Sequence, residues 1–166
     1  MTTMTDSGKI EIQKLSTDIS GLSTTFATIK TVHGDITFRF YTKAAPHTSS
    51  RIIELIQNKF YDGMIFHRAI PNYIIQTGDS TGTGNGRGTS KFQPEFNEIQ
   101  HIKGTIAMAR GIEKDSADTQ FYISLTTLPH LDGKNTVFGQ VVEGLDVLPK
   151  LAKGDRILSI TVNIKN

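Results

Sequence analysis

The sequence predicts a mainly β fold, built as a closed or nearly closed antiparallel β-barrel that two α-helices cap. Three observations point to it: many short runs are typical of β-strands, turn residues separate these runs, and only two segments have a helical period. A parallel sheet would need a crossover, usually a helix, between successive strands, and the sequence does not offer this. Closure into a barrel would also remove the exposed strand edges.

The first two strands are expected within residues 26–41. Two alternating runs flank a turn at residues 33–35, which predicts a β-hairpin with Ile36, Phe38 and Phe40 on one face of its second strand. Further strands are expected at residues 64–68, 73–77, 105–109, 120–125, 136–142 and 157–164.

A first helix is expected to begin at Pro46, because proline suits the first turn of a helix, and to end before Asp62-Gly63. Apolar residues recur within it at a helical period and predict a buried stripe: Ile52, Ile53, Leu55, Ile56 and Phe60. A second, shorter helix is expected over residues 145–151.

The chain is predicted to hold one domain, residues 24–166, after an N-terminal extension of residues 1–23. The extension is rich in Ser and Thr, and only residues 9–15 alternate as a short strand does. It lacks the basic start and apolar run of a secretory signal, and no stretch of the chain reaches the roughly 18 apolar residues of a membrane span. We therefore expect a soluble, cytoplasmic protein with no membrane partner.

Composition disfavours several kinds of partner and chemistry. With 18 Lys and Arg against 16 Asp and Glu, the net charge of +2 gives no sign of the basic field that nucleic-acid binders carry. The absence of cysteine excludes disulfides, thiolate nucleophiles and cysteine-based metal sites. The five histidines lie in no metal-binding motif, so neither a metal nor another cofactor is expected. The nucleophile elbow of acyl-transfer enzymes is also missing.

Five of the 15 glycines crowd the stretch GDSTGTGNGRG, namely Gly78, Gly82, Gly84, Gly86 and Gly88. A phosphate-binding loop would need Lys followed by Ser or Thr after its last glycine, whereas Thr-Ser-Lys follows here. A dinucleotide-binding loop would need a following helix, whereas the next residues contain Pro94 and no helical period. The stretch is interpreted as a long surface loop, and nucleotide binding stays a minor alternative.

The strongest candidate for a site surrounds Arg68, which interrupts an otherwise apolar strand. An arginine in this setting commonly belongs to a structural hydrogen-bond network. The alternative is an apolar, aromatic pocket with a few polar groups, the usual form of a small-ligand or peptide site. Tyr73 and Tyr122 would supply its walls, and the amides of Gln76 and Gln120 its polar groups.

Around these residues the sequence resembles the cyclophilin family of peptidyl-prolyl cis–trans isomerases, from about Ala27 to Ile164. Three blocks carry the resemblance: FHRAIPNYIIQTGD, GTIAMAR leading to DTQFYI, and LDGKNTVFGQVVEGLDVL. The form GTIAMAR is similar to prokaryotic members. The resemblance implies an eight-stranded antiparallel barrel closed at each end by a helix. It also implies a monomeric, cofactor-free enzyme that rotates X-Pro bonds in peptides and in unfolded or folding proteins.

The resemblance further implies roles for particular residues. Arg68 would be catalytic, with Gln76 beside it. The backbone around Ala109 and Arg110 would pair with the residue before proline. The remaining substrate-binding positions would be His67, Tyr73, Ile74, Gln120, Tyr122, His130, Leu131 and Asn135.

Five positions depart from the common family pattern, of which Tyr73 and Ile74 stand where Phe and Met are usual. His130 replaces a frequent Trp that is associated with tight cyclosporin A binding, so reduced affinity for this drug is expected. Asn135 replaces a frequent His, and Tyr122, in place of Phe, brings a hydroxyl that faces the pocket mouth or needs a partner. These departures leave open an alternative function, a proline-peptide-binding scaffold or chaperone with little or no turnover.

Overall fold

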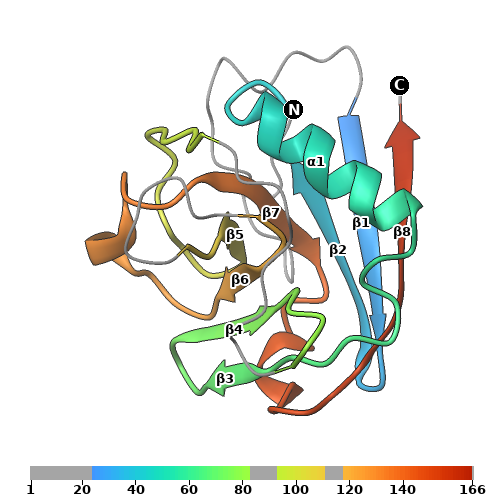
Figure 1. Ribbon diagram of the computed structural model, residues 1–166. Coiled ribbons are helices and arrows are strands. Elements are labelled where there is room, and N and C mark those ends of the chain that lie inside the picture. The colour runs from blue at the N-terminus through green and yellow to red at the C-terminus, as the bar shows by residue number, and fades with distance from the viewer. Residues whose placement is uncertain (1–23, 83–92, 111–117, 166) are drawn as a thin grey trace.

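The computed structural model describes residues 24–82, 93–110 and 118–165, and these form one eight-stranded antiparallel sheet around a core. The order across the sheet is β3-β4-β6-β5-β7-β2-β1-β8 (Figure 1). The strands are β1 (Thr24–Thr31), β2 (Gly34–Phe40), β3 (Arg68–Ile70), β4 (Ile74–Thr77), β5 (Thr105–Met108), β6 (Phe121–Ser124), β7 (Val137–Glu143) and β8 (Ile157–Lys165).

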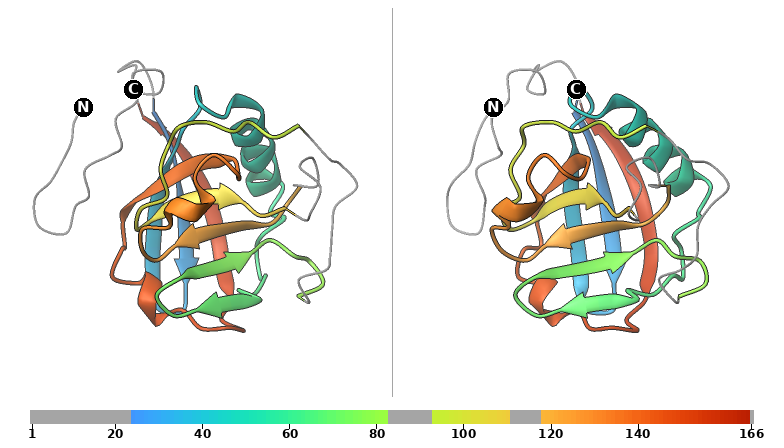
Figure 2. Two further views of the ribbon diagram at one scale, coloured as in Figure 1. Left: turned by 90° about the vertical axis from the view of Figure 1, so that its left-hand side faces the viewer. Right: turned by 60° about the vertical axis from the view of Figure 1, so that its left-hand side comes forward.

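The sheet curls into a half-barrel. Strands β3, β4, β6 and β5 run across the direction of β1, β2 and β8 (Figure 2), and β7 joins the two groups by pairing with both β5 and β2. The predicted hairpin is confirmed, because β1 and β2 pair from Phe26↔Arg39 to Thr31↔Gly34. Its turn requires glycine, since Gly34 has a φ of +132°.

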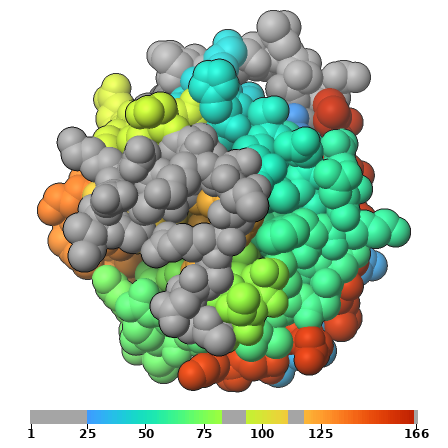
Figure 3. All heavy atoms as spheres, in the orientation of Figure 1, coloured from blue at the N-terminus to red at the C-terminus, as the bar shows by residue number. Residues whose placement is uncertain are grey.

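One α-helix, α1 (Pro46–Gln57), covers the inner side of the sheet and lies against β8 (Figures 1 and 2). Its predicted stripe is confirmed at Ile52, Leu55 and Ile56, which are buried, but the helix ends at Gln57, so Phe60 lies beyond it. Figure 3 shows the outer side of α1 and of the segment that follows it as one continuous surface.

The core has two parts. The larger cluster fills the space between α1 and the sheet and contains the aromatic rings of Phe38, Phe40 and Phe138. The smaller one, called here the second apolar cluster, consists of the buried residues Tyr41, Ile74, Ile99, Ala107, Tyr122, Leu128 and Val137 with Tyr73, Ala44, Ala109 and Leu131 against them. The second cluster lies beside β4, β5 and β6 and therefore next to the predicted site.

The prediction of a closed barrel is wrong, because no strand ladder joins β3 to β8. The segment before β3 meets the start of β8 through one bridge, Ile65↔Arg156, and a few backbone hydrogen bonds such as Ile157 N to Met64 O at 2.7 Å. The predicted strand at residues 64–68 is accordingly reduced to that bridge and to the beginning of β3 at Arg68. The sheet is open along this seam.

The prediction of a second α-helix is also wrong, since residues 145–151 contain only a 3₁₀ turn, η2 (Leu148–Lys150). Pro149 explains this, because it has no N–H to donate and its ring hinders a continuing helix on its N-terminal side. Another 3₁₀ turn, η1 (Pro129–Leu131), carries His130 and Leu131. Within the described residues α1 is the only α-helix.

Some predictions fall outside the described residues: the N-terminal extension with its short strand, and Gly84, Gly86 and Gly88 of the glycine-rich stretch. Gly78 is described, and only glycine suits this position. It has a φ of +102°, and a Cβ there would come within 2.3 Å of the Thr119 carbonyl oxygen.

Among the helices that the structure describes, none has the length and apolar character needed to cross a membrane.

Candidate functional site

Arg68 and Gln76 lie side by side because β3 and β4 form a short hairpin in which these residues are paired. The Arg68 guanidinium donates from Nη1 to Oε1 of Gln76 at 3.5 Å, and Gln76 donates from Nε2 to Oε1 of Gln120 at 3.0 Å. Arg68 is exposed, whereas Gln76 is 9% exposed. The hairpin therefore presents an accessible guanidinium. The largely buried amides of Gln76 and Gln120 support it.

An apolar wall adjoins this polar group through the sheet. Gln76 of β4 is paired with Tyr122 of β6, so the second apolar cluster begins next to Arg68 and Gln76. Four of the predicted substrate-binding residues belong to that cluster, namely Tyr73, Ile74, Tyr122 and Leu131. The structure therefore brings these four side chains together in one apolar cluster.

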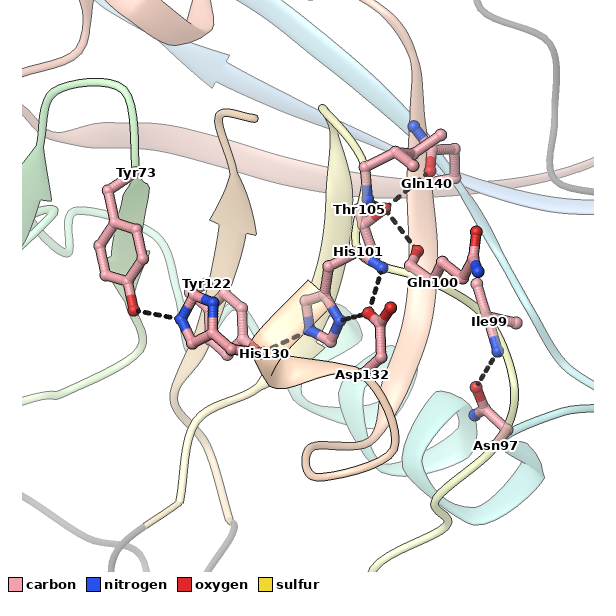
Figure 4. Close-up of polar contacts among 11 residues, drawn as sticks. Tyr73, Asn97, Ile99, Gln100, His101, Thr105, Tyr122, His130, Asp132 and Gln140 are labelled. Carbon is pink, nitrogen blue, oxygen red and sulfur yellow. Dashed lines mark hydrogen bonds and ion pairs between the residues drawn. The ribbon is translucent and has the colours of Figure 1, made fainter. Parts of the chain in front are cut away.

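The Tyr122 hydroxyl is turned into the protein and is not free. It lies 2.8 Å from Nε2 of His101, whose Nδ1 lies 2.9 Å from Oδ1 of Asp132 (Figure 4). The same Asp132 oxygen accepts the His101 backbone N–H at 2.7 Å. His101 is fully buried and Tyr122 is 4% exposed. The sequence interpretation missed His101 and Asp132, although a tyrosine in an apolar wall is a signal that a buried partner is needed.

Burial controls the protonation of this chain of groups. It raises the pKa of the Tyr122 hydroxyl well above its ordinary value, with smaller contributions from Tyr73 and Asp132. It also lowers the pKa of His101, although the hydrogen bond and the charge of Asp132 oppose that effect. At neutral pH the phenol therefore keeps its proton and the imidazole is neutral.

At the exposed rim, Tyr73 and His130 form a second tyrosine–histidine pair (Figure 4). The Tyr73 hydroxyl lies 3.2 Å from Nε2 of His130, and the rings are nearly parallel, with 4° between their planes and 6.0 Å between centroids. The pair joins the β3–β4 hairpin to η1. His130 therefore contacts Tyr73, in addition to standing where a tryptophan is frequent in the family.

The other predicted positions surround the site less directly. Asn135 donates from Nδ2 to the Met108 carbonyl at 3.0 Å, and Arg110 donates from Nε to the Lys134 carbonyl at 2.9 Å. Ala109 donates its backbone N–H to Gln120 at 3.0 Å. The first two contacts hold the end of β5 against the chain before β7, and the third joins it to the chain before β6. The side chains of Asn135 and Arg110 therefore brace the rim.

His67 directly precedes Arg68 in the chain. It is 8% exposed, and its burial lowers the pKa of its imidazole while the charge of Asp79 opposes this effect. His67 is thus a buried imidazole next to Arg68 and close to Asp79. Among the described residues no group of three His, Cys, Asp or Glu side chains could hold a metal ion.

Comparison with known proteins agrees with this geometry. Residues 26–166 match the family model described as cyclophilin type peptidyl-prolyl cis-trans isomerase/CLD. The chain is 40% identical over 140 residues to a peptidyl-prolyl cis-trans isomerase of Synechococcus elongatus, covering 83% of this chain and 96% of that protein. It is 40% identical over 141 residues to one of Helicobacter pylori, covering 82% and 86%.

Solved structures give the same result for the fold. A cyclophilin type peptidyl-prolyl cis-trans isomerase of Cryptosporidium parvum is similar with a TM-score of 0.79 and 27% identity, covering 84% of this chain and 98% of that one. A crystal structure of that protein in the presence of the dipeptide Ala-Pro is similar with a TM-score of 0.78 and 28% identity, covering 83% and 98%.

Proposed function

The chain belongs to the cyclophilin-type peptidyl-prolyl cis–trans isomerase family and catalyses the rotation of X-Pro bonds, and from this we propose that Arg68 is its catalytic residue. One observation carries the proposal. Arg68 is the exposed cation of the β3–β4 hairpin, it contacts Gln76, and the apolar wall of Tyr122 is next in the sheet.

Rotation of an X-Pro bond requires few groups beyond this cation and the apolar wall. Rotation about an amide bond has a barrier of about 18–20 kcal/mol because the nitrogen lone pair is shared with the carbonyl. In the twisted state the lone pair returns to nitrogen, which can then accept a hydrogen bond. A guanidinium N–H directed at the prolyl nitrogen stabilises that state more than either planar isomer, which is the condition for catalysis.

Gln76 supports Arg68 in this proposal. Its Oε1 accepts from the guanidinium while its Nε2 is tied to Gln120, so its amide orientation is fixed from both ends. Tyr73, Ile74, Tyr122 and Leu131 would grip the proline ring, and the backbone around Ala109 and Arg110 would bind the residue before it. The crystal structure of the similar Cryptosporidium protein in the presence of Ala-Pro supports a proline-containing peptide as the ligand.

NMR exchange spectroscopy on a short X-Pro peptide, with catalytic amounts of protein, tests this proposal. We expect Arg68→Ala to reduce turnover at least tenfold, about 1.4 kcal/mol in the activation free energy, while the fold is kept. Arg156→Ala is the matched control, because Arg156 is also an exposed arginine, and its Nη1 bonds the Gly63 carbonyl away from the proposed site. Unchanged turnover in Arg68→Ala would remove Arg68 from this role.

A second candidate, a proline-peptide-binding scaffold, rests on the departures at His130 and Asn135 from the common family pattern. His130 and Asn135 are both engaged in contacts within the protein, with Tyr73 and with the Met108 carbonyl. In the same experiment, a scaffold would bind the peptide without accelerating exchange.

Cyclosporin A, added to the exchange experiment as an inhibitor, is expected to act weakly because His130 occupies the position of the frequent tryptophan. The monomeric state and the cytoplasmic location stay predictions.

A further inference from the structure

We propose that His101 and Asp132 are positioning residues for the proline pocket, acting through the hydroxyl of Tyr122. The hydrogen-bonded chain from Asp132 through His101 to Tyr122 would hold the aromatic ring as a fixed wall of the pocket. The inference rests on the proposed function in one respect, namely that Tyr122 lines the substrate site.

The chain links three separate parts of the fold (Figure 4). Tyr122 is on β6, His101 precedes β5, and Asp132 directly follows η1, the turn that carries His130 and Leu131. Leu128, which precedes η1, donates its backbone N–H to the His101 carbonyl at 3.0 Å. His101 is therefore bonded both to the apolar wall and to the turn that forms the rim, so it sets their relative position.

The direction of each hydrogen bond follows from the chemistry of the groups. The ionised carboxylate of Asp132 can only accept, so Nδ1 of His101 must carry the proton and donate. A neutral imidazole then has Nε2 as an acceptor, and the Tyr122 hydroxyl must donate to it. Each polar atom at these two contacts, which are 2.8 and 2.9 Å long, can therefore be only a donor or only an acceptor.

The same order of groups, carboxylate to imidazole to hydroxyl, also occurs in enzymes with a hydroxyl nucleophile. That role does not fit here. The Tyr122 side chain is 4% exposed, its hydroxyl points at a fully buried imidazole, and burial keeps the phenol protonated. In this proposal the ring face, and not the oxygen, is the part that contacts the substrate. The near-parallel stacking of the His101 and Tyr122 rings, with 14° between their planes, adds to this restraint.

If the ring is held in this way, breaking the chain should weaken substrate binding more than the chemical step. We expect Asp132→Ala to raise KM for an X-Pro peptide by about fivefold while kcat stays within about twofold. Asp132→Asn keeps an acceptor oxygen at Oδ1 and should restore most of the loss. Asp155→Ala is the matched control, because Asp155 also bonds a histidine, His33, at 3.0 Å but lies outside the site.

A double variant separates positioning from a general structural effect. In a Tyr122→Phe background the hydroxyl is gone, so Asp132→Ala should change KM little further. Equal effects of Asp132→Ala in both backgrounds would overturn the inference. Such an outcome would leave the proposed function intact, provided that Arg68→Ala still abolished most of the turnover. A wild-type protein without exchange activity would instead contradict the proposed function itself.

A spectroscopic measurement does not depend on how well the variants fold. Nitrogen NMR of the wild-type histidines should show His101 as a neutral ring with its proton on Nδ1, and the Tyr122 hydroxyl proton should exchange slowly with water. A proton on Nε2 of His101, or a rapidly exchanging Tyr122 hydroxyl, would overturn the inference.

Discussion

Two tyrosine hydroxyls border the apolar part of the site, and each meets a histidine ring in a different environment. The Tyr122 hydroxyl and His101 are buried, so losing one partner leaves the other without water to replace it. Tyr73 and His130 pair at the exposed rim, where water can take the place of either group. Two contacts of similar chemistry should therefore differ in what they contribute to stability.

Removing these hydroxyls one at a time tests that difference. We expect Tyr122→Phe to lower the free energy of unfolding by about 1–3 kcal/mol, because Nε2 of His101 is left unpaired in the core. Tyr73→Phe should change it by less than about 0.5 kcal/mol. Urea denaturation of the two variants beside the wild type measures both values. Equal losses would show that burial does not distinguish the two pairs.

At this scale the sequence identified the residues that touch the apolar wall but not those behind it. Arg68, Gln76 and Tyr73 lie within nine residues of one another, so a single motif contains them. His101 is 21 residues from Tyr122 and 31 from Asp132, and the pairing of β5 with β6 and the packing of η1 bring them together. Contacts of this kind depend on the tertiary fold and leave no local pattern.

At the scale of elements, the start of α1 depends on a residue far along the chain. Its N-cap residue, Ala45, has no side chain that could accept a hydrogen bond. Glu95 replaces it, accepting the backbone N–H groups of His47 and Thr48 at 3.1 and 2.8 Å and the Thr48 hydroxyl at 2.7 Å. A carboxylate there also interacts favourably with the positive end of the helix.

Glu95→Ala removes this distant cap. We expect it to lower the free energy of unfolding by about 1–2 kcal/mol, the usual range for a lost N-cap, with turnover at saturating peptide unchanged. Thermal or urea denaturation measures the effect. Glu98→Ala is the matched control, because Glu98 is an exposed carboxylate in the same segment. If both variants lost the same stability, the cap would have no special contribution.

Element prediction succeeded where local signals agreed and failed where they conflicted. The β1–β2 hairpin and α1 were predicted, since alternation, a glycine turn and a proline at the helix start all point the same way. Residues 145–151 have apolar spacing that suits a helix, but Pro149 limits them to the turn η2. The seam at Ile65 could not be predicted, because pairing across it depends on the distant residue Arg156.

At the scale of the whole molecule, two histidines are buried as parts of one folded unit. His101 stands between the wall and rim of the site, and His67 lies beside Arg68 near Asp79. Burial lowers the pKa of both imidazoles, in each case against an opposing carboxylate. Since the unfolded chain exposes both rings, it binds protons more readily than the folded protein does at mildly acidic pH.

Stability should therefore fall as the medium becomes acidic. A histidine whose folded pKa is lowered contributes stability that is present above its unfolded pKa of about 6.5 and is lost as pH falls from there toward the folded value. We expect the free energy of unfolding, measured by urea denaturation, to decrease steadily from about pH 7 to about pH 5. His101→Gln should reduce that slope, whereas His47→Gln should leave it unchanged, because His47 is exposed. A slope that stayed the same in His101→Gln would show that protonation of this buried ring does not limit the fold in acid.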